Sequence, residues 1–216
     1  WAMALRHYYA FSTLIDSQIG RLLAYLDKTG LADNTVVIFT CDNGTSPKAN
    51  FTQLDEAGIH LNANWRGWKA DAYEGGHRVP GIAWWPGRIK PGQVSDEMVI
   101  SLDLMATMLD FAGAKPPKGR TLDGVSLRPV LLGGGSLGQR QFFWKGQAMR
   151  DGQWKYVANR SGGLFNLSGD PGESVDLAKR HPARARRMAA ALEAWKRDVA
   201  NGATPQPDYD TASLNK

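Results

Sequence analysis

A short apolar run that ends in Asp-Asn-Gly constrains the fold of this chain more than any other feature. Residues 36–39 read Val-Val-Ile-Phe, and after Thr-Cys the chain continues with Asp42, Asn43 and Gly44. A continuous apolar run of this length, rich in β-branched residues, is typical of a strand buried on both faces, as in a parallel sheet between layers of helices. The sequence therefore predicts an α/β fold with this strand in its sheet.

The residues that follow this strand suit either a metal site or a turn. In open α/β sheets, ligands bind beyond the carboxyl ends of the strands. The acidic and amide oxygens of Asp42 and Asn43 would suit a hard divalent cation, which prefers oxygen ligands. The same residues are also typical of an ordinary Asn-Gly turn. Both interpretations stay open at this point.

A second group of motifs lies at residues 65–87. It reads Trp-Arg-Gly-Trp-Lys-Ala-Asp-Ala-Tyr-Glu-Gly-Gly-His-Arg-Val-Pro and then Gly-Ile-Ala-Trp-Trp-Pro-Gly. Together with the Asp-Asn-Gly strand it resembles the arylsulfatase family of the alkaline phosphatase-like superfamily. Members of that family carry Arg-Gly-x-Lys, Tyr-Glu-Gly-Gly-x-Arg-x-Pro and a strand ending in Trp-Pro-Gly in this order. The resemblance implies an alkaline phosphatase-like fold and hydrolysis of sulfate esters, of sulfated carbohydrates or aryl sulfates.

The resemblance also implies roles for single residues. Asp42 and Asn43 would bind Ca²⁺, with Mg²⁺ as the alternative, and Lys69 would be a catalytic residue that contacts the sulfate group. Arg66 and His60 would contact the substrate. Most lysines are exposed, so a plain surface position is the alternative for Lys69, and it is also an alternative for His60.

Three positions depart from the pattern of the family. Trp68 and Ala70 flank Lys69 where relatives often have glycine, so the pocket beside the lysine should be narrower. Cys41 stands where many relatives have serine. The family's catalytic cysteine lies in Cys-x-Pro-x-Arg and is oxidised to formylglycine. Cys41 precedes Asp-Asn-Gly, and we interpret it as a small residue at a strand end.

The resemblance covers about the last half of such an enzyme and nearly all of this chain. The family's nucleophile motif and its principal catalytic histidines belong to the N-terminal half. We therefore expect the formylglycine to lie outside this chain, and the chain to be an inactive fragment when alone. Its expected partners are the missing half, a sulfate ester, or a second copy of itself. Alternatives are a phosphatase or phosphonate hydrolase of the same superfamily, or a non-catalytic fragment. The family suggests a periplasmic, secreted or lysosomal-type compartment.

Patterns along the chain predict two domains and a tail. Residues 1–138 would be the C-terminal part of the catalytic α/β domain, with an amphipathic helix over 8–26 that stops at Gly30. A long loop at 45–64, a strand at 81–85 and a helix at 100–113 would follow. Residues 139–203 would form a subdomain with short antiparallel strands at 142–149, 154–158 and 164–167 under a helix at 185–199. Residues 204–216 would be a tail.

Composition excludes a few classes of protein. Hydrophobic residues make up 43% of the 216 residues, enough for a core. No apolar run reaches 18 residues, so we expect no transmembrane helix and no membrane partner. The single cysteine excludes an intrachain disulfide. The net charge of +5 decides little, and without a supporting motif we expect no nucleic-acid partner.

Overall fold

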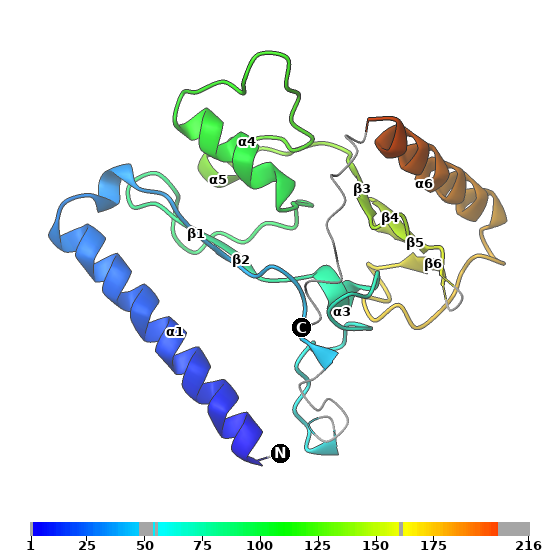
Figure 1. The fold of residues 1–216 in the computed structure, drawn as a ribbon, viewed down its shortest axis with the longest axis horizontal. Coiled ribbons are helices and arrows are strands. Elements are labelled where there is room, and N and C mark those ends of the chain that lie inside the picture. The colour runs from blue at the N-terminus through cyan, green and yellow to red at the C-terminus, as the bar shows by residue number, and fades with distance from the viewer. Residues whose placement is uncertain (1, 48–53, 55, 160–161, 203–216) are drawn as a thin grey trace, which may run out of the picture. The chain divides into compact units, whose positions relative to one another are not determined.

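The structure, a computed structural model, describes residues 2–47, 54, 56–159 and 162–202 (Figure 1). It divides into two compact units, Trp1–Arg140 and Gln141–Lys216. The predicted domain boundary lies at 138. The predicted tail at 204–216 and much of the predicted loop at 45–64 lie outside the described residues.

The first unit contains helices and one pair of strands. In chain order these elements are α1 (Ala2–Lys28), the 3₁₀ turn η1 (Ala32–Asn34), β1 (Val37–Thr40), α3 (Glu74–His77), β2 (Gly81–Trp84), α4 (Leu102–Phe111) and α5 (Arg128–Gly133). None of the described helices is long and apolar enough to cross a membrane.

Helix α1 ends where the sequence predicts. Gly30 has a φ of +70°, a conformation that glycine adopts without steric cost. The amide of Leu31 donates to the carbonyl of Leu26, and the amide of Gly30 donates to that of Asp27. This pair of bonds is a Schellman motif, which satisfies carbonyls at the helix end. The turn then leads through η1 into β1.

Strands β1 and β2 form an antiparallel pair, with Val37 opposite Trp84 and Thr40 opposite Gly81. The strand expected at 36–39 is therefore present, but the prediction that it is parallel and buried on both faces is wrong for the described residues. Val37 is half-buried and Phe39 is exposed. An apolar run indicates that a strand lies in hydrophobic surroundings, but it does not indicate whether the neighbouring strand is parallel or antiparallel. The antiparallel pairing therefore could not be predicted from this run.

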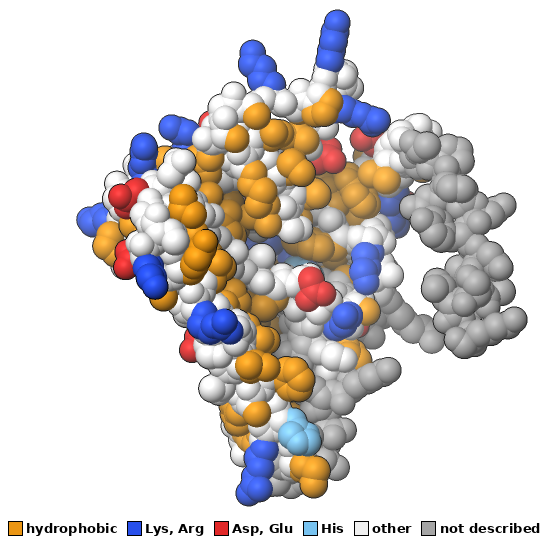
Figure 2. All heavy atoms as spheres, turned by 60° about the vertical axis from the view of Figure 1, so that its left-hand side comes forward, with side chains coloured by type: hydrophobic (Ala, Val, Ile, Leu, Met, Phe, Trp, Pro, Cys, Tyr) orange, Lys and Arg blue, Asp and Glu red, His pale blue; other side chains and the backbone are white. Residues whose placement is uncertain are grey.

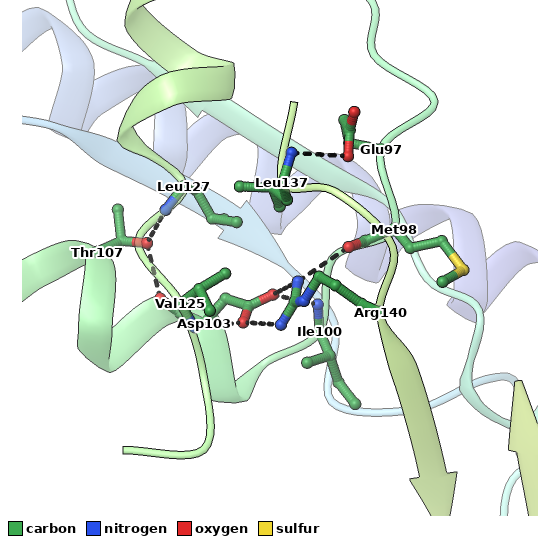
Figure 3. A network of polar contacts seen from close by, with 9 residues as sticks. All are labelled: Glu97, Met98, Ile100, Asp103, Thr107, Val125, Leu127, Leu137 and Arg140. Carbon is green, nitrogen blue, oxygen red and sulfur yellow. Dashed lines mark hydrogen bonds and ion pairs between the residues drawn. The ribbon is translucent and has the colours of Figure 1, made fainter. Parts of the chain in front are cut away.

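A buried ion pair ties together separate segments of the first unit (Figure 3). The side chain of Asp103, on α4, is fully buried and accepts two hydrogen bonds from Arg140, at 2.6 and 2.9 Å. The amides of Ile100 and Val125 donate to the same carboxylate at 2.9 and 3.0 Å, and Arg140 also donates to the carbonyl of Met98. The pair thereby joins three stretches of chain, at residues 98–103, 125 and 140.

This environment stabilises the charged form of Asp103. Burial by itself raises the pKa of the carboxyl group, but the hydrogen bonds from Arg140 and from the amides of Val125 and Ile100 outweigh it. The pKa therefore lies below the ordinary value of 3.8. One turn further along α4, the hydroxyl of Thr107 donates to the carbonyl of Asp103 and accepts from the amide of Leu127.

The second unit is a four-stranded antiparallel sheet with one helix. The strands β3 (Gln141–Trp144), β4 (Ala148–Asp151), β5 (Trp154–Val157) and β6 (Gly163–Asn166) pair in sequence order. The expected single strand at 142–149 is two strands, because Lys145 and Gly146 have positive φ values of 50° and 63° and turn the chain. The remaining predicted strands agree with the structure.

Helix α6 (Pro182–Gly202) covers this sheet with an apolar stripe. Met188 and Leu192 pack with Met149 and Leu164 of the strands, and all four are essentially fully buried. Burial of each such side chain stabilises the fold by about 1.5–3 kcal/mol. A charged pair is also buried in this unit, because Nζ of Lys155 lies 3.0 Å from the carboxylate of Glu173 and both side chains are fully buried.

We predict that Asp103→Asn destabilises the first unit by about 3–5 kcal/mol, the cost of leaving one partner of a buried ion pair alone. Because the folded pKa is lowered, the contribution of the carboxylate is complete above the ordinary value of 3.8. It should be lost as the pH falls through the lowered value. Urea unfolding followed between pH 3 and 7 should show this loss in the parent chain, and the variant should lack this component of the pH dependence.

Asp110→Asn is the matched control, because Asp110 lies on the same helix. Its ion pair with Arg128 is 3.6 Å long and its side chain is 39% exposed, so its loss should cost no more than about 1 kcal/mol. Equal effects of the two substitutions would contradict the role assigned to Asp103.

Candidate active site

The carboxyl end of β1 presents the two oxygen-bearing side chains that the sequence singles out. Asp42 is exposed and Asn43 is half-buried. The side-chain amide nitrogen of Asn43 donates to the carbonyl of Gly44 at 3.0 Å. Because the nitrogen has this partner, the side-chain oxygen of Asn43 is the atom that can act as an acceptor or ligand.

Backbone hydrogen bonds bring this strand end together with the motif region at 65–80. The amide of Gly44 donates to the carbonyl of Gly76 at 3.0 Å, and the amide of Lys69 donates to the carbonyl of Thr45 at 2.8 Å. The amide of Gly75 donates to the carbonyl of Arg66 at 2.7 Å. The Asp-Asn-Gly motif at 42–44 therefore meets the Arg-Gly-x-Lys motif at 66–69 and the Glu-Gly-Gly motif at 74–76, and we call this place the junction.

The approach of these backbones leaves no room for side chains. A Cβ atom on Gly44 would lie 1.8 Å from the carbonyl oxygen of Gly75, and one on Gly75 would lie 2.2 Å from that of Gly67. A Cβ atom on Gly76 would lie 2.3 Å from the carbonyl oxygen of Asp71. Such distances are below any van der Waals contact, so these positions require glycine for packing. The glycines of the Asp-Asn-Gly and Glu-Gly-Gly motifs thus share one structural task.

Lys69 lies in a tight turn next to this junction. The amide of Trp68 donates to the carboxylate of Asp71 at 3.0 Å, and the amide of Asp71 donates back to the carbonyl of Trp68. Ala70 has a φ of +83°, a conformation that costs a residue with a Cβ atom about 1–3 kcal/mol. The side chain of Lys69 is exposed. The turn therefore fixes the backbone of the lysine and leaves its amine accessible.

Two arginines near the turn contact aromatic rings. The guanidinium of Arg66 lies 4.0 Å from the centre of the Tyr73 ring, and that of Arg78 lies 4.8 Å from the ring of Trp65. Cation–π contacts of this length are worth about 0.5–2 kcal/mol. The contact supports a structural contribution of Arg66, and its predicted contact with substrate stays a prediction.

The sequence analysis did not identify Glu74 as a notable residue. Its carboxylate is almost fully buried and lies 3.4 Å from Arg78 and 3.8 Å from the imidazole of His77. Residues three and four positions apart meet on one face of a helix, and the motif Glu-Gly-Gly-His-Arg has this spacing. The spacing alone could have indicated the ion pair with Arg78.

Asn62 is a second residue that sequence reasoning missed. Its side-chain nitrogen donates to the carbonyl of Gly67 at 2.7 Å, and its side-chain oxygen accepts from the amide of Thr45 at 3.3 Å. Asn62 thus joins the strand end to the loop of Lys69. The neighbouring His60, predicted to touch substrate, is exposed. Cys41 is also exposed and carries a free thiol.

The chemistry of the donors at the strand end fits part of the shell of a hard cation. Asp42 and Asn43 provide carboxylate and amide oxygens, the ligands that Ca²⁺ prefers, but Ca²⁺ takes ~6–8 of them. In the described ranges there is no group of three or more His, Cys, Asp or Glu side chains that could hold a metal. These two residues would therefore supply only part of a complete site.

Comparison with known proteins identifies the family. The family model described as Sulfatase matches residues 3–114, which include all of α1 except Ala2, both strands of the first unit and the whole junction. The chain belongs to the sulfatase family. This finding confirms the resemblance inferred from the sequence motifs.

Individual relatives agree with this assignment. N-acetylgalactosamine-6-sulfatase of Mus musculus is 40% identical over 144 residues, which cover 65% of this chain and 27% of the relative. A solved structure from a Bacteroides thetaiotaomicron locus for the metabolism of multiple glycosaminoglycans is similar with a TM-score of 0.73. It is 29% identical and covers 84% of this chain and 43% of that one.

A phosphonate monoester hydrolase of Agrobacterium radiobacter is also similar, with a TM-score of 0.61 and 25% identity. The match covers 85% of this chain and 39% of that chain. The structural matches confirm the predicted fold class, the alkaline phosphatase-like α/β fold of sulfatases. The sulfatase segment described here thus spans less than half the length of each of these three proteins.

We predict that Gly75→Ala disrupts the junction, because the new methyl group would overlap the carbonyl oxygens of Gly67 and Arg66. Overpacking of this kind costs about 1–3 kcal/mol, and the bond from the amide of residue 75 to Arg66 should break. Hydrogen exchange measured by mass spectrometry should speed up in peptides covering 61–78.

Gly20→Ala is the matched control, since a Cβ atom there meets nothing within 4 Å. Gly20 lies inside α1, where alanine is favoured over glycine by about 1 kcal/mol. The control should therefore slow exchange in α1 and leave 61–78 unchanged. Normal exchange at 61–78 in Gly75→Ala would rule out the tight packing described above.

Proposed function

We propose that this chain is the part of a sulfuric ester hydrolase that binds the sulfate group and supplies two of the metal ligands. The observation that carries this proposal is the junction of three motifs. The bonds from Lys69 to Thr45 and from Gly44 to Gly76 hold the lysine and the Asp42–Asn43 pair on neighbouring segments. The family membership and the name of the mouse relative support sulfate esters as the substrate class.

In this proposal Lys69 provides positive charge to the sulfate. A sulfate ester carries its negative charge on three non-bridging oxygens, and preorganised cations aimed at these oxygens stabilise the transition state. The ammonium group is a compact charge with three donors. The tight turn at Trp68–Asp71 orders the backbone before the substrate binds, so little entropy is lost on binding.

Asp42 and Asn43 would hold a divalent cation, with Ca²⁺ preferred and Mg²⁺ as the alternative. Such an ion would supply charge neutralisation at the sulfate oxygens. The two side chains have the donor chemistry for this task and are too few to complete the shell. The remaining ligands and the formylglycine nucleophile would come from a part of the sulfatase domain outside this chain. Cys41 is not proposed as the nucleophile, because it precedes Asp-Asn-Gly and lacks the Cys-x-Pro-x-Arg context.

The substrate class we favour is a sulfated carbohydrate. Among the relatives, the mouse protein is named for N-acetylgalactosamine 6-sulfate hydrolysis, and the Bacteroides protein belongs to a locus for glycosaminoglycan metabolism. Arg66 and His60 are proposed to contact the part of the substrate beyond the sulfate. An aryl sulfate would be bound by the same sulfate-binding residues.

A second candidate function is hydrolysis of a phosphonate or phosphate monoester. The similarity to the Agrobacterium enzyme favours it, and both ester classes carry negative oxygens that a lysine and a metal can bind. Turnover by the full product of the gene distinguishes the two candidates. A sulfatase should hydrolyse sulfate esters far faster than phosphonate monoesters, and the reverse ratio would reject our first choice.

We predict that Lys69→Ala in the full gene product lowers the rate for every sulfate ester by a similar factor, on the order of 10²–10³. The factor should not depend on the leaving group, because the lysine contacts only the sulfate. Rates for a series of aryl sulfates with different leaving-group acidity measure this. Lys115→Ala is the control and should leave the rates unchanged, since Lys115 is also exposed and lies outside the junction. If the effect of Lys69→Ala depends strongly on the leaving group, the lysine lines the wall of the pocket and does not contact the sulfate.

We also predict that Asp42→Ala in the full gene product reduces affinity for Ca²⁺ or Mg²⁺. The loss should exceed the ~10–100-fold effect that mutating an outer-shell partner causes, because a charged ligand is removed. Calorimetric titration and metal content after purification measure the change. Asp96→Ala removes an exposed carboxylate outside the junction and should change neither the metal affinity nor the metal content. Equal metal content in the Asp42→Ala and Asp96→Ala variants would rule out Asp42 as a ligand.

A further inference from the structure

The positive charge of this chain is concentrated in residues 177–192, which we call the basic segment. Five of the 26 Lys and Arg residues lie there, and the segment contains no Asp or Glu. The rest of the chain has as many basic as acidic residues, 21 of each, so the whole formal net charge of +5 belongs to the basic segment. On the face of the molecule in Figure 2, by contrast, Lys and Arg side chains are spread among hydrophobic and acidic ones.

The basic segment covers the turn before α6 and the first three turns of that helix. Lys179, Arg180, Arg186 and Arg187 are exposed, and Arg184 is half-buried. Within the part of the chain that the structure describes, none of these five side chains forms an ion pair with an acidic group. The first turn of α6 has no acidic residue, although carboxylates are favoured at this end of a helix. The charges of the basic segment therefore have no acidic partner among the described residues.

The backbone before α6 is held against the sheet of its own unit. The amides of Arg180 and His181 both donate to the carbonyl of Leu177, at 3.0 and 2.9 Å. The amide of Leu177 in turn donates to the carbonyl of Leu164 in β6 at 2.8 Å. A surface whose backbone is already ordered loses less entropy when it binds a ligand, so these bonds favour binding by the cations they carry.

One guanidinium of the basic segment is oriented by an aromatic ring. The guanidinium of Arg184 lies 4.5 Å from the centre of the Trp154 ring. The ring of His181 packs edge-on against the same indole, with the ring centres 5.0 Å apart. Arg187 is three residues beyond Arg184, and residues with this spacing lie on the same side of a helix. The exposed cation of Arg187 therefore lies beside one whose position is already fixed.

We propose that the basic segment binds a sulfated polysaccharide. The class of partner rests on the proposed function, in which the substrate is a sulfated carbohydrate, and the proposal adds a binding surface in the second unit. A guanidinium group donates two parallel hydrogen bonds to an oxyanion, so Arg is well suited to sulfate groups. Short segments rich in Lys and Arg are a general feature of surfaces that bind heparin or nucleic acid, and a concentration of one sign of charge attracts polyanions.

The structure favours this partner over an anionic membrane or a nucleic acid. A helix at a membrane surface inserts its apolar face, and the apolar side chains Met188 and Leu192 of α6 are already buried against the sheet. Proteins that bind single-stranded nucleic acid without sequence preference add aromatic platforms for the bases, whereas the ring of Trp154 is in contact with Arg184. A chain of sulfated sugars requires only cations for its repeated anionic groups.

Binding of heparin chains by the full product of the gene tests the proposal. The triple variant Arg180→Gln, Arg186→Gln and Arg187→Gln removes three exposed cations and keeps Arg184 on its ring. Its affinity for heparin at low salt should fall by on the order of tenfold or more, because binding to a polyanion releases counterions. The slope of log Kd against log salt concentration should become shallower by about one for each lost contact. Arg180→Lys, Arg186→Lys and Arg187→Lys together keep the charge and should retain the slope.

The matched control is the triple variant Lys115→Gln, Lys118→Gln and Arg120→Gln. It removes the same charge from three exposed positions outside the basic segment, and it should bind heparin like the parent protein. Hyaluronan of the same length, which lacks sulfate groups, should bind more weakly than heparin to the parent protein. Equal losses of heparin affinity in the two Gln variants overturn the proposal. Tighter binding of duplex DNA or of phosphatidylserine vesicles than of heparin at the same salt concentration also overturns it.

Turnover of a small aryl sulfate separates this proposal from the proposed function. Both Gln variants should hydrolyse the ester at the rate of the parent protein, because none of the altered residues belongs to the candidate active site. Normal turnover together with unchanged heparin affinity in the Arg180, Arg186 and Arg187 variant would reject the role of the basic segment alone. Heparin binding that these substitutions weaken, in a protein that hydrolyses no sulfate ester, would reject only the proposed function.

Discussion

The candidate site depends on one constraint, the direct packing of backbone against backbone where three segments meet. A Cβ atom on Gly44, Gly75 or Gly76 would lie 1.8–2.3 Å from a carbonyl oxygen of the neighbouring segment. Side chains at these positions would push the segments apart, and the bonds from Gly44 to Gly76 and from Gly75 to Arg66 would not form. Because the glycines have no side chain, the segments can approach closely, and this approach sets the position of Lys69 relative to Asp42 and Asn43.

Sequence motifs predicted the members of this junction but not how they are joined. Asp42, Asn43 and Lys69 could be selected because each combines a suitable chemistry with a recognisable neighbourhood. Asn62 could not, since its two hydrogen bonds to Thr45 and Gly67 depend on a loop path that no periodic pattern describes. Long-range partners of polar side chains depend on tertiary structure, whereas elements such as α1 and α6 follow from local periodicity and end signals.

The two units bury charge in different ways, and neither pair was visible in the sequence. In the second unit Lys155 and Glu173 are a fully buried pair. In the first unit the buried pair of Asp103 and Arg140 joins segments that are far apart in the sequence. A buried ion pair contributes little net stability compared with apolar packing, but breaking it is costly. In the first unit the pair thus fixes the arrangement of the segments more than it adds to their stability.

The burial predicted for the strand at residues 36–39 differs from the burial in the structure. The apolar run indicates a strand that is covered on both faces, yet Phe39 is exposed and the strand has one antiparallel neighbour among the described residues. The composition of a strand and its burial are thus separate properties, and only the structure gives the second. The same holds for α4, whose apolar stripe lies opposite its buried Asp103 and Thr107. In both elements, apolar side chains that the pattern would bury are exposed among the described residues, because tertiary contacts and not periodicity decide which face of an element is covered.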